Sequence, residues 1–245
     1  MPSQGSISAP FLGSRVIEDI SLDVLEALVR KEVLFASRWQ FRQGQSAEEW
    51  SKLRQGKIEP LYESLMSKVR ARKIVVPKAA YGHFACERIG NGLLINGERK
   101  DFRFDFPREA ASPNRCISDL FPYGFASFML VTAGPGVAKA AAASFAEHRY
   151  SEAFYIKGLA AEFAEAAASH CHRTIRQELG VAEDAGCRYS PGYPAFPSLV
   201  DQKKIFELLG GMRIGLEVTQ TCQLVPEHSI SAIVSVDSNA VLFRP

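Results

Sequence analysis

The first third of the chain carries apolar residues at helical spacing. Ser21 is a good N-cap, and the apolar face that follows it continues as far as Phe41. A second helix is predicted at Ser46, because Glu49 three residues later completes the form of a capping box. A third is predicted after Pro60, where apolar residues again recur at helical spacing. The N-terminal third is therefore expected to be helical.

The middle of the chain changes from helical spacing to alternation. Residues 73–86 and 90–98 are predicted strands, and Asn96-Gly97 is a strong signal for a hairpin turn. Phenylalanines and charged residues alternate strictly through residues 100–106, so the three rings are expected to face one way. Residues 125–132 form a further apolar strand.

The last part mixes both periods. Helices are predicted over residues 135–148, 150–179 and 201–209, and residues 214–224 with 229–236 are expected to form a final hairpin. Blocks of strands between helices, joined by hairpin signals, favour an α+β fold. The expected architecture is a twisted, mainly antiparallel sheet with flanking helices.

Composition narrows the class of protein. The chain has 245 residues, 47% hydrophobic and 23% charged, which excludes wholesale disorder and a coiled coil. Residues 1–9 are small and polar and are expected to be a flexible tail, with residues 10–245 forming a single domain. The net charge of +2 argues against a nucleic-acid partner.

The dispersed cysteines and the lack of a signal-peptide pattern predict a cytoplasmic location. Five dispersed cysteines with no CxxC pair suit a reducing compartment and offer no zinc site. The first residues lack the pattern of a signal peptide, and charges interrupt the alanine-rich stretch near residue 140. We therefore expect no membrane association.

Three short patterns suggest chemistry but have simpler interpretations. Gly134-Pro135-Gly136 resembles part of a dinucleotide loop, yet the third glycine is missing, so a strand-to-helix turn is favoured. His170 and His172 stand two apart on a predicted helix and point in different directions, so they cannot chelate one ion. His83 and Cys86 have no matched partners and are interpreted as core residues. No metal site is expected, and no residue is assigned a catalytic role.

One segment, residues 187–197, indicates a binding site. Its prolines and glycine prevent regular structure, so its backbone amides and carbonyls are expected to face a ligand. Arg188 offers a fork suited to a carboxylate, and Tyr189 and Tyr193 add flat apolar faces. The set suits a zwitterionic ligand with an aromatic part. A rigid structural turn, with Arg188 in an ordinary salt bridge, fits the residues equally well.

The same segment resembles the signature Arg-x-x-x-Gly-Tyr-x-Ala-Cys-Pro of the C-terminal activation domain of cobalamin-dependent methionine synthase. The matching residues are Arg188, Gly192, Tyr193, Ala195 and Pro197. The similarity continues in order along almost the whole chain, over residues 10–17, 34–41, 80–86, 104–108, 159–176, 205–209 and 225–233.

The resemblance implies a task and a site. The family's domain binds S-adenosylmethionine and caps a cobalamin-carrying module. An electron from a flavodoxin or ferredoxin-type donor, with the methyl group of S-adenosylmethionine, then restores methylcobalamin from cob(II)alamin. By this resemblance Arg188 pairs with the ligand carboxylate, while Glu165, with Glu32, faces the cationic end. The residues expected to line the site are Tyr189, Ser190, Pro191, Gly192, Tyr193 and Ala195.

Four positions depart from the family pattern. Phe196 replaces the signature cysteine, and Lys31 stands where an aspartate is expected on the first helix. Ala182 replaces an acid, and residues 241–243 lack an expected tyrosine. These departures bear on whether S-adenosylmethionine binding is retained.

The homocysteine, folate and cobalamin modules of methionine synthase are not found in these residues, and neither is the corrinoid-ligating pattern Asp-x-His-x-x-Gly. We therefore expect a free-standing reactivation subunit that acts on a separate corrinoid protein, as part of a split methionine synthase rather than as an independent catalyst. One alternative is a corrinoid-protein cap or chaperone that no longer binds S-adenosylmethionine. Another is a stand-alone methyltransferase for a small substrate.

Overall fold

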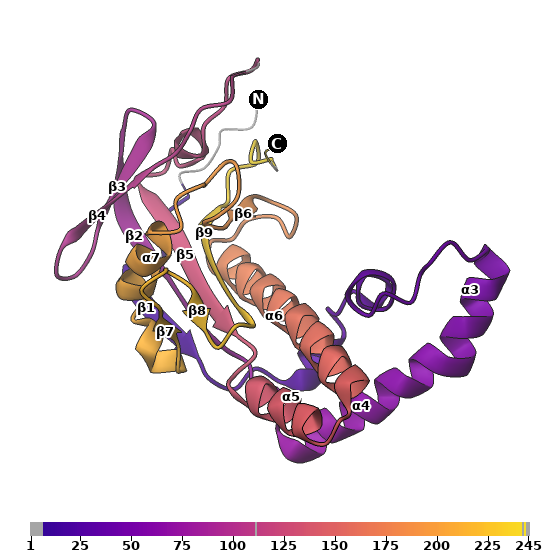
Figure 1. The fold of residues 1–245 in the computed structure, drawn as a ribbon. Helices are drawn as coiled ribbons and strands as arrows, with labels where there is room; N and C mark the ends of the chain where they lie inside the picture. The colour runs from indigo at the N-terminus through magenta and orange to yellow at the C-terminus, as the bar shows by residue number, and fades with distance from the viewer. Residues whose placement is uncertain (1–6, 111, 242, 244–245) are drawn as a thin grey trace.

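The computed structural model describes residues 7–110, 112–241 and 243, and its centre is one antiparallel sheet (Figure 1). The strand order is β4-β3-β2-β5-β9-β6, and β1 pairs with β2 beside this path. All neighbouring strands run antiparallel, which confirms the predicted α+β class. The strands of this sheet are β1 (Gly13–Ile17), β2 (Lys78–Ile89), β3 (Gly92–Asn96), β4 (Asp101–Asp105), β5 (Phe125–Thr132), β6 (Cys187–Tyr189) and β9 (Ser229–Ser235).

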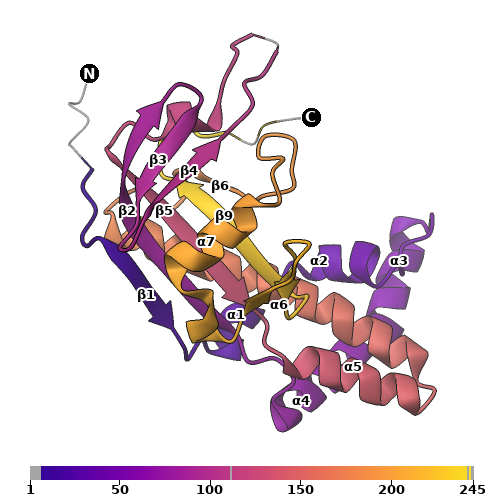
Figure 2. The same cartoon turned by 60° about the vertical axis from the view of Figure 1, so that its left-hand side comes forward.

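Helices cover both faces of the sheet. The long helix α6 (Tyr150–Glu178) packs on β2, β5 and β9 from one side, next to α5 (Gly136–Ala146). The short helix α7 (Asp201–Leu209) packs on the other side, as Figure 2 shows. Strand β5 is buried along its whole length because Phe128 and Leu130 enter the core beneath α7, whereas Met129 and Val131 enter the core beneath α6.

The N-terminal residues form a helical arm that extends past one end of α6 (Figure 1). Its elements are α1 (Leu22–Glu26), α2 (Lys31–Val33), a π-helical segment η1 (Leu34–Arg38), α3 (Ala47–Leu53), a second π-helical segment η2 (Arg54–Ile58) and α4 (Glu59–Arg72). The Ser21 hydroxyl accepts a hydrogen bond from the Asp23 amide, and Ser46 with Glu49 forms the capping box predicted from sequence.

The second and third predicted helices are one continuous helical run, so the expected break before Pro60 is wrong. Pro60 stands in the first turn of α4, immediately after η2. A proline lacks the amide that an α-helix would use, and a locally widened helical turn accommodates that loss.

Two strand assignments also need correction. The strand expected over residues 73–86 begins at Lys78 and ends at Ile89, where Gly90 and Asn91 turn the chain into β3. The expected C-terminal hairpin does not form. Instead β9 pairs with β5 and β6, and residues 211–225 form a 3₁₀ turn, η4 (Gly211–Ile214), and a separate small hairpin of β7 (Glu217–Val218) and β8 (Leu224–Val225).

Most of the expected N-terminal tail, residues 1–6, lies outside the described residues, while Ile7 and Ala9 pack against the core beneath α6. Among the described residues, no helix is long and apolar enough to cross a membrane.

Candidate functional site

A cleft of about 340 Å³ opens where β6 leaves the sheet beside α6. Six of the nine residues predicted for the binding site line it: Glu165, Arg188, Tyr189, Ser190, Tyr193 and Ala195. Pro194, Phe196, Ile230 and Phe243 complete the wall. The volume lies within the range of small-molecule sites.

Arg188 lies on β6, paired with Val234 of β9, and its side chain is about one quarter exposed. Its Nη2 donates a hydrogen bond to Oε2 of Glu165 at 3.5 Å. Its Nη1 is buried and has no hydrogen-bond partner among the described residues. Burial lowers the pKa of Arg188 from its ordinary value, although a guanidinium stays charged in a protein. Arg188 thus forms the salt bridge that the interpretation as a structural turn expects, and this salt bridge borders an open cleft.

The loop after β6 is held by its own backbone. The Gly192 amide donates to the Phe196 carbonyl at 2.8 Å, and the Phe196 amide donates to the Tyr193 carbonyl at 2.8 Å. The expectation that the loop leaves its amides to a ligand is therefore wrong for these two groups. Gly192 has φ +94°, a backbone conformation that favours glycine. The turn projects Tyr193 outward, with 68% of its surface exposed.

Phe196, which replaces the family's signature cysteine, is a core residue. It is fully buried, and its ring meets the rings of Phe104 and Phe106 edge-on, with centroids 6.2 Å and 5.0 Å apart. The ring therefore anchors the loop to the core beneath α7.

The C-terminal residues close one side of the cleft. The Tyr189 hydroxyl donates to the Val241 carbonyl at 2.8 Å, and the Tyr189 ring packs edge-on against Phe243 at 5.5 Å. Of the positions where a tyrosine was expected, Leu242 lies outside the described residues and Phe243 lines the cleft. Phe243 thus supplies an aromatic ring without a hydroxyl.

The structure does not bring Glu32 to the cleft. Its carboxylate pairs with Arg42 and Arg54, at 3.4 Å in each case. Lys31, at the position of the expected aspartate, pairs with Glu59 at 3.7 Å. These side chains contact other parts of the N-terminal arm.

Sequence reasoning missed a buried carboxylate close to the cleft. Glu162 is fully buried on α6 and accepts hydrogen bonds from Arg30 Nε at 3.2 Å, Arg30 Nη2 at 3.3 Å and Arg38 Nε at 3.2 Å. The signal was a glutamate within the apolar pattern of a helix, between Leu159 and Phe163, because a buried charge requires a partner.

Two of the histidines considered in the sequence, His83 and His172, are buried. His172 is buried, and burial, followed by the charges of Arg176 and Arg188, lowers its pKa to about 3, so the ring is neutral. His83 is fully buried, and its Nδ1 lies 2.8 Å from the Ser127 hydroxyl. In the part of the chain that the structure describes, no group of three or more metal-binding side chains is found.

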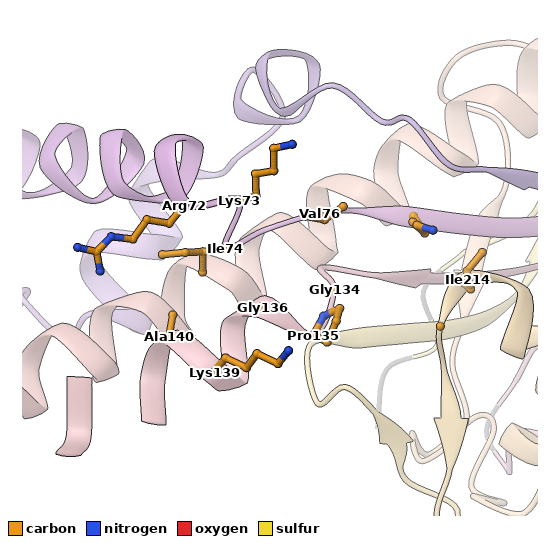
Figure 3. Close-up of a pocket in the computed structure, with 12 residues that line it drawn as sticks. Arg72, Lys73, Ile74, Val76, Gly134, Pro135, Gly136, Lys139, Ala140 and Ile214 are labelled. Atoms are coloured by element: carbon orange, nitrogen blue, oxygen red, sulfur yellow. The ribbon is translucent and has the colours of Figure 1, made fainter. Parts of the chain in front are cut away.

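A larger hollow of about 700 Å³ lies between the end of α4 and the start of α5. Arg72, Lys73, Lys78 and Lys139 line it, but Figure 3 shows the amines of Lys73 and Lys139 pointing in different directions. No residue predicted for the binding site lines this hollow. Pro135 caps the start of α5, as the simpler interpretation of the glycine-containing turn expected.

Comparison with known proteins confirms the resemblance inferred from the sequence. The family model described as "Vitamin B12 dependent methionine synthase, activation domain" matches residues 37–244. The methionine synthase of Mycobacterium tuberculosis is 28% identical over an alignment of 272 residues, which covers 96% of this chain and 23% of that protein. The methionine synthase of Mycobacterium leprae is 28% identical, covering 92% of this chain and 22% of that protein.

A solved structure supports the fold. The MetH reactivation domain, in a crystal structure bound to AdoHcy, superposes with a TM-score of 0.82 at 22% identity, covering 97% of this chain and 82% of that one. The chain spans less than a quarter of the length of the two curated relatives.

Proposed function

The chain belongs to the family of activation domains of vitamin B12 dependent methionine synthase, and from this premise we propose that its cleft binds S-adenosylmethionine during reactivation of a corrinoid methyltransferase. The proposal places the ligand between β6 and α6, in the cleft that Arg188, Tyr193 and Ala195 of the signature line.

The observation that carries the proposal is the state of Arg188. A buried N–H group without a hydrogen-bond partner is costly, and few remain in folded proteins. Among the residues that the structure describes, Nη1 of Arg188 has no such partner and lies beside a ligand-sized cleft, while Nη2 is already held by Glu165. A ligand carboxylate would satisfy the remaining donor with a charge-assisted bond.

The rest of the cleft suits the other parts of S-adenosylmethionine. Glu165 is about one third exposed and offers the negative charge that an ammonium or sulfonium group requires. Tyr193 and Phe243 present aromatic faces on which an adenine ring can pack. Two positively charged groups of the ligand would thus meet one carboxylate, since Glu32 lies elsewhere.

The role of this chain in reactivation is to bind and orient the reactants. S-adenosylmethionine supplies a methyl group, and a corrinoid held by another module supplies the metal that accepts it. Arg188 and Glu165 fix the amino-acid end of the ligand, and the rigid loop that ends at Phe196 holds Tyr193 over the cleft. No side chain of the cleft is required as a general base, because methyl transfer from a sulfonium releases a neutral thioether.

We propose further that this chain meets its corrinoid on a separate protein and receives its electron from a flavodoxin or ferredoxin-type donor. The proposal is supported by the family match, which covers the activation domain, and by these 245 residues, which hold no Asp-x-His-x-x-Gly pattern for ligating a corrinoid. In an assay with a cobalamin-loaded methionine synthase core that lacks its activation domain, added chain should restore turnover after oxidation. Failure to restore it with any reductant would contradict action in trans.

Calorimetric titration tests the ligand. Wild-type protein should bind S-adenosylmethionine, and Arg188→Ala should weaken the affinity by about one to two decades, because a charge-assisted bond contributes roughly 1.5–3 kcal/mol. Arg188→Lys should recover only part of the loss, since lysine lacks the planar fork. Arg173→Ala is the matched control, because Arg173 is exposed on α6 and does not line the cleft. Equal affinities for wild type and Arg188→Ala would exclude this site. No binding by a folded wild type would favour a cap without ligand.

A further inference from the structure

Glu162 joins the N-terminal arm to the helix that borders the cleft. It stands three residues before Glu165 on α6, so the two side chains share one face of the helix. Each carboxylate is paired with arginine, Glu162 with Arg30 and Arg38, and Glu165 with Arg188. The difference between them is access. Glu162 has no exposed surface, whereas Glu165 is about one third exposed at the cleft.

These five side chains form one charge cluster with three cations and two carboxylates. Arg30 is near enough to Arg188 that its charge contributes to lowering the pKa of Arg188. Without Glu162, two further arginine charges beside the cleft would have no buried counter-ion. Arg30 could then compete with Arg188 for Glu165, which is one helical turn away.

We propose that Glu162 is a positioning residue that makes the electrostatic potential at the cleft more negative. The cleft thereby prefers a cationic ligand over a neutral ligand of the same shape. The inference rests on the proposed function, because it concerns the same cleft. Glu162 acts through Arg30 and Arg38 and does not touch the ligand.

Two probes that differ by one charge test the idea. S-adenosylmethionine carries a sulfonium cation, whereas S-adenosylhomocysteine has a neutral thioether and the same amino-acid and adenosine groups. Glu162→Gln keeps the shape of the side chain and removes its charge. This variant should weaken the binding of S-adenosylmethionine more than the binding of S-adenosylhomocysteine. The ratio of the two dissociation constants should change by roughly 3- to 30-fold. That fold-change corresponds to about 0.7–2 kcal/mol, since each 1.4 kcal/mol is tenfold.

Two further variants separate charge from structure. Glu162→Gln combined with Arg30→Gln removes one charge of each sign and should return the ratio toward the wild-type value. Arg30→Gln alone leaves Glu162 bonded to Arg38 and should shift the ratio in favour of S-adenosylmethionine. This single variant keeps the test valid even if Glu162→Gln fails to fold.

Glu152→Gln is the matched control. Glu152 lies on the same helix and also bonds two cations, Lys68 and Arg149, both at 2.9 Å, but it does not line the cleft. Its substitution should leave the ratio unchanged.

If Glu162→Gln weakened the binding of both ligands equally, its role would be merely structural and the inference would be overturned. An unchanged ratio of dissociation constants in Arg30→Gln would overturn it as well. A folded wild type that binds neither ligand would overturn the proposed function itself. These two failures are therefore distinguishable.

Discussion

Replacing Phe196 with the cysteine of the family signature should destabilise this chain, although the change restores a family residue. In the structure the ring is fully buried and packs against Phe104 and Phe106. A cysteine side chain is much smaller, so Phe196→Cys leaves a cavity at the base of the loop that carries Tyr193.

The expected cost follows from burial. A buried phenylalanine removes about 150–250 Å² from water, and truncation to alanine costs about 3–5 kcal/mol. Cysteine retains one heavy atom beyond Cβ, so we expect a loss of about 2–4 kcal/mol. With a urea m-value of about 2–3 kcal/mol/M, the unfolding midpoint should fall by about 1–2 M.

Urea unfolding followed by tryptophan fluorescence measures the change. Phe145→Ala is the control, because Phe145 is 61% exposed on α5 and should shift the midpoint far less. If Phe196→Cys moved the midpoint no more than Phe145→Ala does, the ring would not anchor the loop, and the structural account of this departure would fail. A folded Phe196→Cys protein should also bind S-adenosylmethionine more weakly, because Tyr193 loses its fixed position.

Two smaller perturbations test the loop and the acid stability. Gly192→Ala should destabilise by about 1–3 kcal/mol because φ is +94° and Leu199 approaches closely; an unchanged urea midpoint would contradict the need for glycine. Hydrogen bonds from Arg108 lower the pKa of Asp119, so its stabilisation is present above the unfolded value near 4 and is lost as pH falls below it. Asp119→Asn should therefore flatten the decline in stability between about pH 5 and 3, and a parallel decline in both proteins would refute this account.

The sequence predicted local elements better than their pairing. The limits of β5, α6 and α7 agree closely with the structure, because each element carries a strong period and clear end signals. The strand that pairs with β9 could not be predicted from such local signals. Its alternation fixes which residues face the core, but the choice between a neighbouring hairpin and the distant β5 depends on how α6 and α7 cover the sheet.

The residues that line the cleft were predictable where one segment carries them, and Glu165 of α6 was also placed correctly, but other residues distant in the chain were not. Arg188 and Tyr193 belong to a single signature segment, and the structure brings both to the cleft. Glu32 was assigned to the site because it stands next to Lys31, which replaces the aspartate of the family pattern. In the structure Glu32 pairs with arginines of the N-terminal arm. Glu162 was missed because its significance depends on two arginines more than 120 residues away in the chain.

Helix α6 carries the core and the cleft on one rigid element. Its apolar residues pack on the sheet, Glu162 holds the N-terminal arm, and Glu165 stands at the cleft one turn further on. Any motion that separates the arm from α6 must expose or neutralise Glu162, since a buried carboxylate is costly without its partners. Such a motion would also change the electrostatic potential at Arg188 and Glu165. If the proposed binding in the cleft depends on Glu162, docking of the arm and binding of the ligand are coupled, and each favours the other to the same extent.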